Sequence, residues 1–476
     1  NADFSWQNGN IFLRNLMAKH EAGELSGQIL LQDDMIRYRT RTSLPLSAYR
    51  AFIRDDSGLD HSLARSNFTP RSKVSVEAEG TIQRSNLRVW DATGKVLLEN
   101  FSYNGVPMIR AAAAFYMTPL DSIFTNVQVE FSYASYERNR LAAPLPSGTM
   151  HATKVHYDAE TGLTHIDSLQ GTAWPGPILR LFAPGAANHV EKHYGFQSPP
   201  DLSATGVIDV RSPATRTDMV TQVETSSATT YQFLGQTLQL DNLSATVRTR
   251  HHLHDINNLH FDTLGGTGEG MLSVQKQPAG LASVSGGIGF EKINLAEVGK
   301  TYGFSNPSKG SLTAHIDFKA DEAILEDGKH DWQVEGQAAF KDSSVNEVPI
   351  LRATANFDIN SLGSNWTKVE TEFDYASYVL RRRYGGPRSA VVRAESIRHD
   401  KKTKLTHISN LRGTAWPGPV LRLIVPDAAD HVDESYGFRS PPSFTTSGVA
   451  DHRRPDTRTD LRSRIEARGT TECEFL

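Results

Sequence analysis

Residues 163–218 read LTHIDSLQGTAWPGPILRLFAPGAANHVEKHYGFQSPPDLSATGVIDVRSPATRTD, and residues 405–460 read LTHISNLRGTAWPGPVLRLIVPDAADHVDESYGFRSPPSFTTSGVADHRRPDTRTD. Without a gap, 35 of these 56 positions are identical, at a constant offset of 242 residues. An internal repeat of this length decides the architecture before any short motif is considered. It also bears on function, because a building block must occur in every copy, whereas a catalytic group is needed once.

The repeat continues on both sides of this block. Upstream, residues 131–136 (FSYASY) match residues 373–378 (FDYASY), and downstream Phe233-Leu234 matches Phe475-Leu476. Near the start, Asn15-Leu16 matches Asn258-Leu259 at an offset of 243. We therefore expect two tandem units, residues 1–234 and 235–476. Because the match leaves no room for a linker, we expect them to be segments of one continuous β assembly.

Apolar and polar residues alternate through both units. Residues 127–133 and 312–318 show the pattern most clearly. Alternation with a period of two is typical of strands that bury one face and expose the other. Clusters of Gly, Pro, Asn and Asp separate the runs, as expected of turns. The sequence therefore predicts a mainly β fold, a long antiparallel sheet that forms a groove and is built from two tandem repeats.

One helical interruption is expected in each unit. After residues 174–177 (WPGP), the residues Ile178, Leu181 and Phe182 are spaced for one face of a helix. Pro184 interrupts this run, because an interior proline lacks a backbone donor and clashes with the preceding turn. We predict one short kinked helix in each repeat. The recurring Trp174 and Trp416 are interpreted as large side chains that fill the corner between strand and helix.

Composition excludes several classes of protein. The 476 residues carry a formal net charge of −4, which gives no reason to expect a nucleic-acid partner. No stretch approaches the roughly 18 apolar residues that a membrane-spanning helix needs. The single cysteine, Cys473, cannot form an intrachain disulfide, which removes the disulfide-rich secreted class.

The sequence contains only weak signals of catalytic, metal-binding or phosphate-binding sites. Paired histidines recur (His165 with His407, His189 with His431), but no third ligand of a suitable type is evident beside them. Residues 251–255 read HHLHD, but the first unit has no equivalent histidines and no acidic residue is clearly paired with this tract, so no metal site is predicted. Arg216 and Asp218 are expected to form an ion pair. Residues 299–301 (GKT) lack the earlier glycine of a phosphate-binding loop and are interpreted as a turn. We predict no catalytic residue and no cofactor.

Several segments resemble a known family. Residues 231–238 (YQFLGQTL) followed by 243–245 (LSA) resemble a strand pair of AsmA-like bacterial envelope proteins. Residues 258–259 with 265–270 (GGTGEG) are similar to another element of that family, and residues 196–206 and 438–448 are similar to strands of its large, repeat-containing members. The WPGP segment is not part of the general family pattern.

This resemblance implies a function. AsmA-like proteins are envelope proteins with a long β trough in the periplasm, and large members are thought to carry phospholipid between membranes. The expectation is therefore a non-enzymatic periplasmic groove segment in outer-membrane biogenesis, which binds phospholipid or another acyl-chain ligand and reaches the membrane through parts outside this chain. Two alternatives remain open: an extracellular structural or adhesive β-repeat protein, and a carbohydrate-active enzyme on a β scaffold.

The lipid-groove candidates are alternating residues that we expect to point inward. In the first unit they are Val127, Val129, Phe131 and Tyr133, and in the second they are Val369, Thr371, Phe373 and Tyr375. The pattern leaves open whether these side chains line a lipid path or fill an ordinary core.

Overall fold

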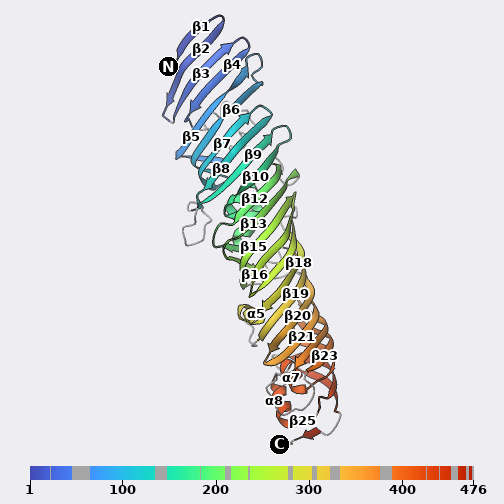
Figure 1. The fold of residues 1–476 in the computed structure, drawn as a ribbon. Helices are drawn as coiled ribbons and strands as arrows, with labels where there is room; N and C mark the ends of the chain where they lie inside the picture. Colours follow the sequence, from blue (N-terminus) through green and yellow to red (C-terminus); the bar gives the residue numbers. More distant parts are fainter. Residues whose placement is uncertain are drawn as a thin grey trace. The chain divides into compact units, whose positions relative to one another are not determined.

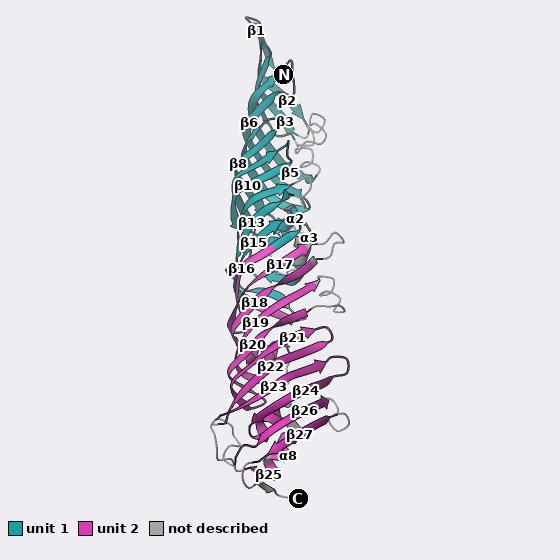
Figure 2. Ribbon diagram, turned by 90° about the vertical axis from the view of Figure 1, so that its right-hand side faces the viewer, with its two compact units in different colours: residues 1–231, 241–254 teal, residues 232–240, 255–476 magenta. Residues whose placement is uncertain are grey.

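The computed structural model describes residues 1–21, 23–44, 65–133, 147–182, 184–209, 216–233, 236–276, 282–302, 308–321, 333–375, 389–424, 426–438, 440–451, 459–467 and 471–473. The chain divides into two compact units (Figure 2). Unit 1 comprises residues 1–231 and 241–254, and unit 2 comprises residues 232–240 and 255–476. The boundary expected from the repeat lies between residues 234 and 235. It falls next to residues 232–240, which belong to unit 2 although the following residues 241–254 belong to unit 1.

Unit 1 is a meander in which each strand pairs antiparallel with the next (Figure 1). Its sheet strands are β1 (Asp3–Gln7), β2 (Asn10–His20), β3 (Gly23–Gln32), β4 (Met35–Thr42), β5 (Ser66–Gln83), β6 (Trp90–Tyr103), β7 (Val106–Met117), β8 (Asp121–Phe131), β9 (Gly148–Asp158), β10 (Leu163–Thr172), β12 (Asp201–Asp209), β13 (Asp218–Glu224) and β15 (Gln236–Arg250), of which residues 241–250 belong to unit 1.

Unit 2 repeats the meander from β17 to β27. Its strands are β16 (Leu253–Thr263), β17 (Gly266–Lys276), β18 (Ala282–Asn294), β19 (Ser308–Asp321), β20 (Gln333–Val345), β21 (Val348–Asn360), β22 (Gly363–Asp374), β23 (Ser389–Asp400), β24 (Leu405–Thr414), β26 (Ser443–Asp451) and β27 (Asp460–Glu466). The prediction of a mainly β fold with one long antiparallel sheet is confirmed, and the sheet is open.

A small two-stranded ladder follows the predicted kinked helix in each unit. In unit 1, β11 (Tyr194–Phe196) pairs with β14 (Thr229–Phe233), and in unit 2, β25 (Tyr436–Phe438) pairs with β28 (Thr471–Cys473). Cys473 faces Tyr436 in the position that Tyr231 takes opposite Tyr194. The lone cysteine therefore occupies a strand position of the repeat.

The helices differ in detail from the prediction. Each kinked helix is two short helices: α2 (Pro175–Phe182) and α3 (Pro184–His193) in unit 1, and α7 (Pro417–Ile424) and α8 (Pro426–Ser435) in unit 2. Pro184 and Pro426 begin the second helix of each pair, because the first helical position needs no backbone donor. The proline that interrupts one helix thus starts another.

Unit 2 contains a further helix, α5 (Leu295–Tyr302), which the apolar periodicity did not predict. Residues 299–301 lie inside it, so their interpretation as a turn was wrong. Asn294 caps the helix, since its side-chain oxygen accepts a hydrogen bond from the Ala296 N–H at 2.9 Å. Asn294 followed by Glu297 three residues later was the available signal.

Several strands contain a β-bulge at a residue with positive φ. In β8, Asn126 has φ 51°, and the pairing register with β7 shifts beside it. The register also shifts beside Ser168 (φ 53°) in β10 and beside Lys368 (φ 52°) in β22. The bulge places the apolar residues on either side, such as Phe124 and Val127, on the same face of the sheet. It also increases the local twist and bends the strand.

Candidate functional site

One continuous row of facing residues crosses the sheet of unit 1. Successive strands contribute Thr40, Ala78, Gly94, Phe115, Phe124, Val155, Ile166, Gly206 and Met219. Directly opposed residues of neighbouring strands lie on one face. The row therefore marks an apolar face, which Phe4 and Trp6 extend onto β1 by facing Leu13 and Ile11.

Unit 2 carries the same row in the same register. It consists of Ile288, Ile316, Gly336, Phe357, Trp366, Ile397, Ile408, Gly448 and Leu461. From Gly336 onward, each position lies 242 residues after its counterpart in unit 1, as Phe357 does after Phe115. The repeat thus preserves a surface rather than an isolated constellation of residues.

The opposite face of the sheet is polar and charged. Arg39 pairs with Glu79 at 3.5 Å and Arg41 with Glu77 at 3.3 Å across β4 and β5. In unit 2, Glu370 of β22 lies 2.8 Å from Arg393 of β23. Along β19 the two faces alternate residue by residue: Thr313, His315 and Asp317 are exposed, whereas Ala314 is buried and Ile316 is partly buried.

The helix pair covers the apolar face in one part of each unit. The Trp174 backbone N–H donates a hydrogen bond of 2.8 Å to the Tyr133 hydroxyl, and the two rings meet edge to face with centroids 5.8 Å apart. In unit 2 the Trp416 N–H donates to the Tyr375 hydroxyl at 3.0 Å. Trp174 exposes 6% of its surface. Its position agrees with the role of a corner residue between strand and helix.

A hairpin turn fixes the end of the first helix in each pair. Asn104, in the turn between β6 and β7, donates its side-chain amide to the Leu181 carbonyl at 3.3 Å. The equivalent Asn346 donates to the Arg422 carbonyl at 3.2 Å. Arg180 then joins α2 to α3 through Glu191, with N–O distances of 2.8 and 3.3 Å. The helix pair is therefore held to the sheet by polar contacts at its end.

The predicted inward-facing residues fall into two groups. Phe131, Tyr133, Phe373 and Tyr375 are 1–2% exposed and belong to the cores beneath the helix pairs. Val129 and Val369 are partly buried and pack against those cores. Val127 and Thr371 are also partly buried and face Ala152 and Val392. The helix pairs cover the first group. The part of the apolar face that remains accessible is therefore formed by other residues.

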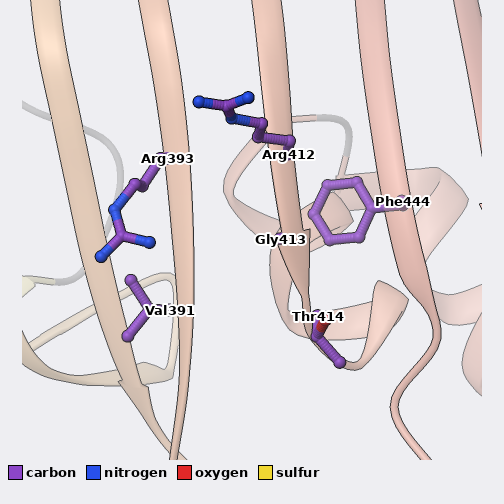
Figure 3. A pocket seen from close by; sticks show the side chains of 6 residues that line it. All are labelled: Val391, Arg393, Arg412, Gly413, Thr414 and Phe444. Atoms are coloured by element: carbon purple, nitrogen blue, oxygen red, sulfur yellow. The ribbon is translucent and has the colours of Figure 1, made fainter.

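A depression in unit 2 lies where β23, β24 and β26 meet. It has a volume of about 450 Å³ and is lined by Val391, Arg393, Arg412, Gly413, Thr414 and Phe444. Figure 3 shows the two guanidinium groups on neighbouring strands. The corresponding residues of unit 1 include His151, Gln170 and Leu202, so the repeat does not preserve this chemistry. No carboxylate lines the depression, which therefore offers no acid–base pair for hydrolysis.

The expected pair of Arg216 and Asp218 is not formed. Arg216 lies 2.8 Å from the buried carboxylate of Asp209, and Asp218 pairs with Arg248 at 2.9 Å. The reason is strand pairing: Asp218 starts β13 and faces β15, whereas Arg216 precedes the strand and turns back toward the end of β12. The hydrogen bond from Arg248 lowers the pKa of Asp218. The equivalent Arg458 lies outside the described residues.

The histidines have separate surroundings. His165 stacks on His156, with ring centroids 5.8 Å apart, and His254 Nδ1 lies 3.0 Å from the Thr249 hydroxyl. His252 is exposed in the turn before β16. Among the described residues, no group of three or more His, Cys, Asp or Glu side chains is arranged to hold a metal ion.

Within the described part of the chain, no helix combines the length and apolar character needed to cross a membrane. Comparisons with protein-family models, with curated proteins and with solved structures found no match to this chain.

Proposed function

We propose that this chain is a non-enzymatic segment of an AsmA-like envelope protein in the periplasm, where it holds the acyl chains of phospholipid along the apolar face of its sheet. In this role it contributes to lipid transport between membranes and to outer-membrane biogenesis. The observation that carries the proposal is the apolar row of facing residues, which runs from β4 to β13 in unit 1 and from β18 to β27 in unit 2.

A single sheet cannot bury its own apolar face, which needs a second layer. The helix pairs provide that layer over the clusters around Trp174 and Trp416. Farther along the face, large apolar side chains are accessible: Trp6 is 70% exposed and Phe4 is 63% exposed. An acyl chain laid on such residues gains about 0.8 kcal/mol for each methylene removed from water. Lipid binding would therefore complete the fold without any chemical step.

The open sheet favours this role over that of an adhesive repeat protein, because the adhesive alternative would require a closed, filled core. The repeat also favours it over an enzyme. A groove becomes longer with each repeat and keeps one chemistry along its length, whereas the arginine-lined depression occurs in unit 2 and has different residues at the equivalent positions of unit 1.

Native mass spectrometry of the purified chain tests the proposal. We expect bound phospholipid on the wild type and its loss in Ile316→Glu, since the new carboxylate lies on the apolar face. Thr313→Glu is the matched control, because Thr313 is exposed on the polar face of the same strand, and it should retain lipid. Absence of lipid on the wild type, or equal loss in both variants, would contradict the proposal.

A further inference from the structure

A row of facing residues on the polar face of unit 2 contains three arginines. The row consists of Arg393 on β23, Arg412 on β24, Thr445 on β26 and Arg464 on β27. The corresponding row of unit 1, 242 residues earlier in the sequence, consists of His151, Gln170, Ser203 and Gln222. Unit 2 therefore carries arginines where unit 1 has a histidine and two glutamines in the same register.

The fold does not require these arginines. Unit 1 forms the same strand pairs without them, and there the Ser203 hydroxyl donates a hydrogen bond to Gln222 Oε1 at 3.1 Å. In unit 2, Arg393 and Arg412 are directly opposed, and like charges at opposed positions destabilise a sheet. Proteins retain local conflicts of this kind at functional sites. The arginine pair therefore calls for a functional explanation.

The positive charge of this row is only partly neutralised within the protein. Glu370 lies 2.8 Å from Arg393, but its carboxylate is shared with an arginine of β21. At the end of the row, Arg464 lies 2.8 Å from Glu466. In the described part of the chain, no carboxylate forms an ion pair with the exposed Arg412. The centre of the row therefore offers a cation to an anionic ligand.

The two opposed guanidinium groups border the depression of about 450 Å³ in unit 2. Figure 3 shows the Arg412 guanidinium directed toward the strand that carries Arg393. The Thr414 hydroxyl lines the same depression and lies 3.2 Å from the Ser443 hydroxyl, with either oxygen able to donate. When Ser443 donates, the Thr414 O–H can donate to a ligand. The depression thus presents two guanidinium groups and one hydroxyl donor, and its lining residues include no carboxylate.

We propose that this depression binds a phosphate monoester group between Arg393 and Arg412, with Thr414 as a further donor. A guanidinium donates two parallel hydrogen bonds to a phosphate, which its planar fork matches. Side chains opposed on neighbouring strands have Cβ atoms about 5 Å apart, so both forks can reach one group. A phosphate monoester has three terminal oxygens and a charge of about −1.5 to −2 at pH 7, which suits two guanidinium groups. The proposal is independent of acyl-chain binding.

Isothermal titration calorimetry of the full chain with inorganic phosphate tests the site. We expect one phosphate per chain, and Arg412→Gln should weaken binding about tenfold or more, because charge-assisted hydrogen bonds are lost. Unit 1 has Gln170 at the equivalent position, so the strand accepts this residue. Arg398→Gln is the matched control: it removes the same charge from an exposed position of β23 outside the depression, and it should bind phosphate like the wild type.

Vesicle flotation distinguishes a soluble phosphate from a lipid headgroup. The probe is a phosphatidylcholine vesicle with or without phosphatidic acid, whose headgroup is a terminal phosphate. If the ligand is a lipid, phosphatidic acid should recruit the wild type and Arg398→Gln more strongly than Arg412→Gln. If it is soluble, all three chains should bind vesicles equally while the phosphate titration separates Arg412→Gln. If neither measurement separates Arg412→Gln from Arg398→Gln, the proposal is overturned.

Discussion

The hydroxyl of Tyr133 has a structural role, which explains why the segment around it is repeated in the second unit. It accepts the hydrogen bond of the Trp174 N–H at the point where β10 ends and α2 begins, and both residues are buried. A buried backbone donor without a partner costs about 1–3 kcal/mol. Tyr375 does the same for Trp416. The strongest sequence motif of the chain therefore describes how the helix pair is attached to the sheet.

This hydrogen bond predicts the effect of removing the Tyr133 hydroxyl. Tyr133→Phe should lower the free energy of unfolding of unit 1 by about 1–3 kcal/mol, because the Trp174 N–H loses its acceptor. Tyr116→Phe is the control: Tyr116 is 47% exposed, and its change should stay within about 0.5 kcal/mol. Urea unfolding followed by tryptophan fluorescence measures both. Equal stabilities of the two variants would show that the hydroxyl is dispensable.

Two tyrosines of the small ladder predict a dependence on pH. Burial raises the pKa of Tyr194 above its ordinary 10.0, and the charge of Tyr231 raises it further; burial also raises the pKa of Tyr231. The unfolded state therefore ionises first, so the contribution is fully present below pH 10 and is lost as the pH rises above it. Urea midpoints measured from pH about 8 to about 11 should fall more steeply for the wild type than for Tyr194→Phe/Tyr231→Phe. Parallel curves would contradict this assignment.

At the scale of the element, the sequence predicted the strands well and their irregularities poorly. Alternation in residues 312–318 correctly identified the apolar face of β19, because that face alternates without a break. In β8 the alternation changes phase at Asn126, so Phe124 and Val127 share a face although they are three residues apart. The missed signal was an apolar pair at this spacing with Asn between its members.

The covering of the candidate site was equally hard to predict. Phe131 and Phe373 follow the same alternation as residues on the accessible part of the face, and only the placement of the helix pair distinguishes them. Local patterns report which side of the sheet a residue faces. Whether another element lies above that side depends on contacts between distant parts of the chain, such as Asn104 with Leu181.

The bulges predict how substitutions at positive φ will behave. Asn126→Val should destabilise unit 1 by about 1–2 kcal/mol, because a β-branched residue is strained in the left-handed region. Asn126→Gly should change stability by less than about 0.5 kcal/mol, because glycine reaches this region freely. Asn126 is exposed, so neither change disturbs the core. Urea unfolding measures both, and an unaffected Asn126→Val variant would show that the bulge does not fix the register.

At the scale of the whole molecule, both units present the same one-sided chemistry. Ion pairs such as Arg39 with Glu79 keep one face in water, and facing apolar residues line the other. In the proposed role, this face would bind a class of ligand, the acyl chain, through contact area rather than through individual contacts. Such a role needs a repeated surface and no catalytic motif.

The most direct test of lipid binding is photo-crosslinking with a phospholipid that carries a diazirine in its acyl chain, followed by peptide mapping. We predict crosslinks on the apolar row, at residues such as Ile316, Trp366 and Ile397, and at their counterparts Phe124 and Val155 in unit 1. The exposed polar face, represented by Thr313 and His315, should remain unlabelled. Labelling spread equally over both faces, or confined to the arginine-lined depression, would contradict the account.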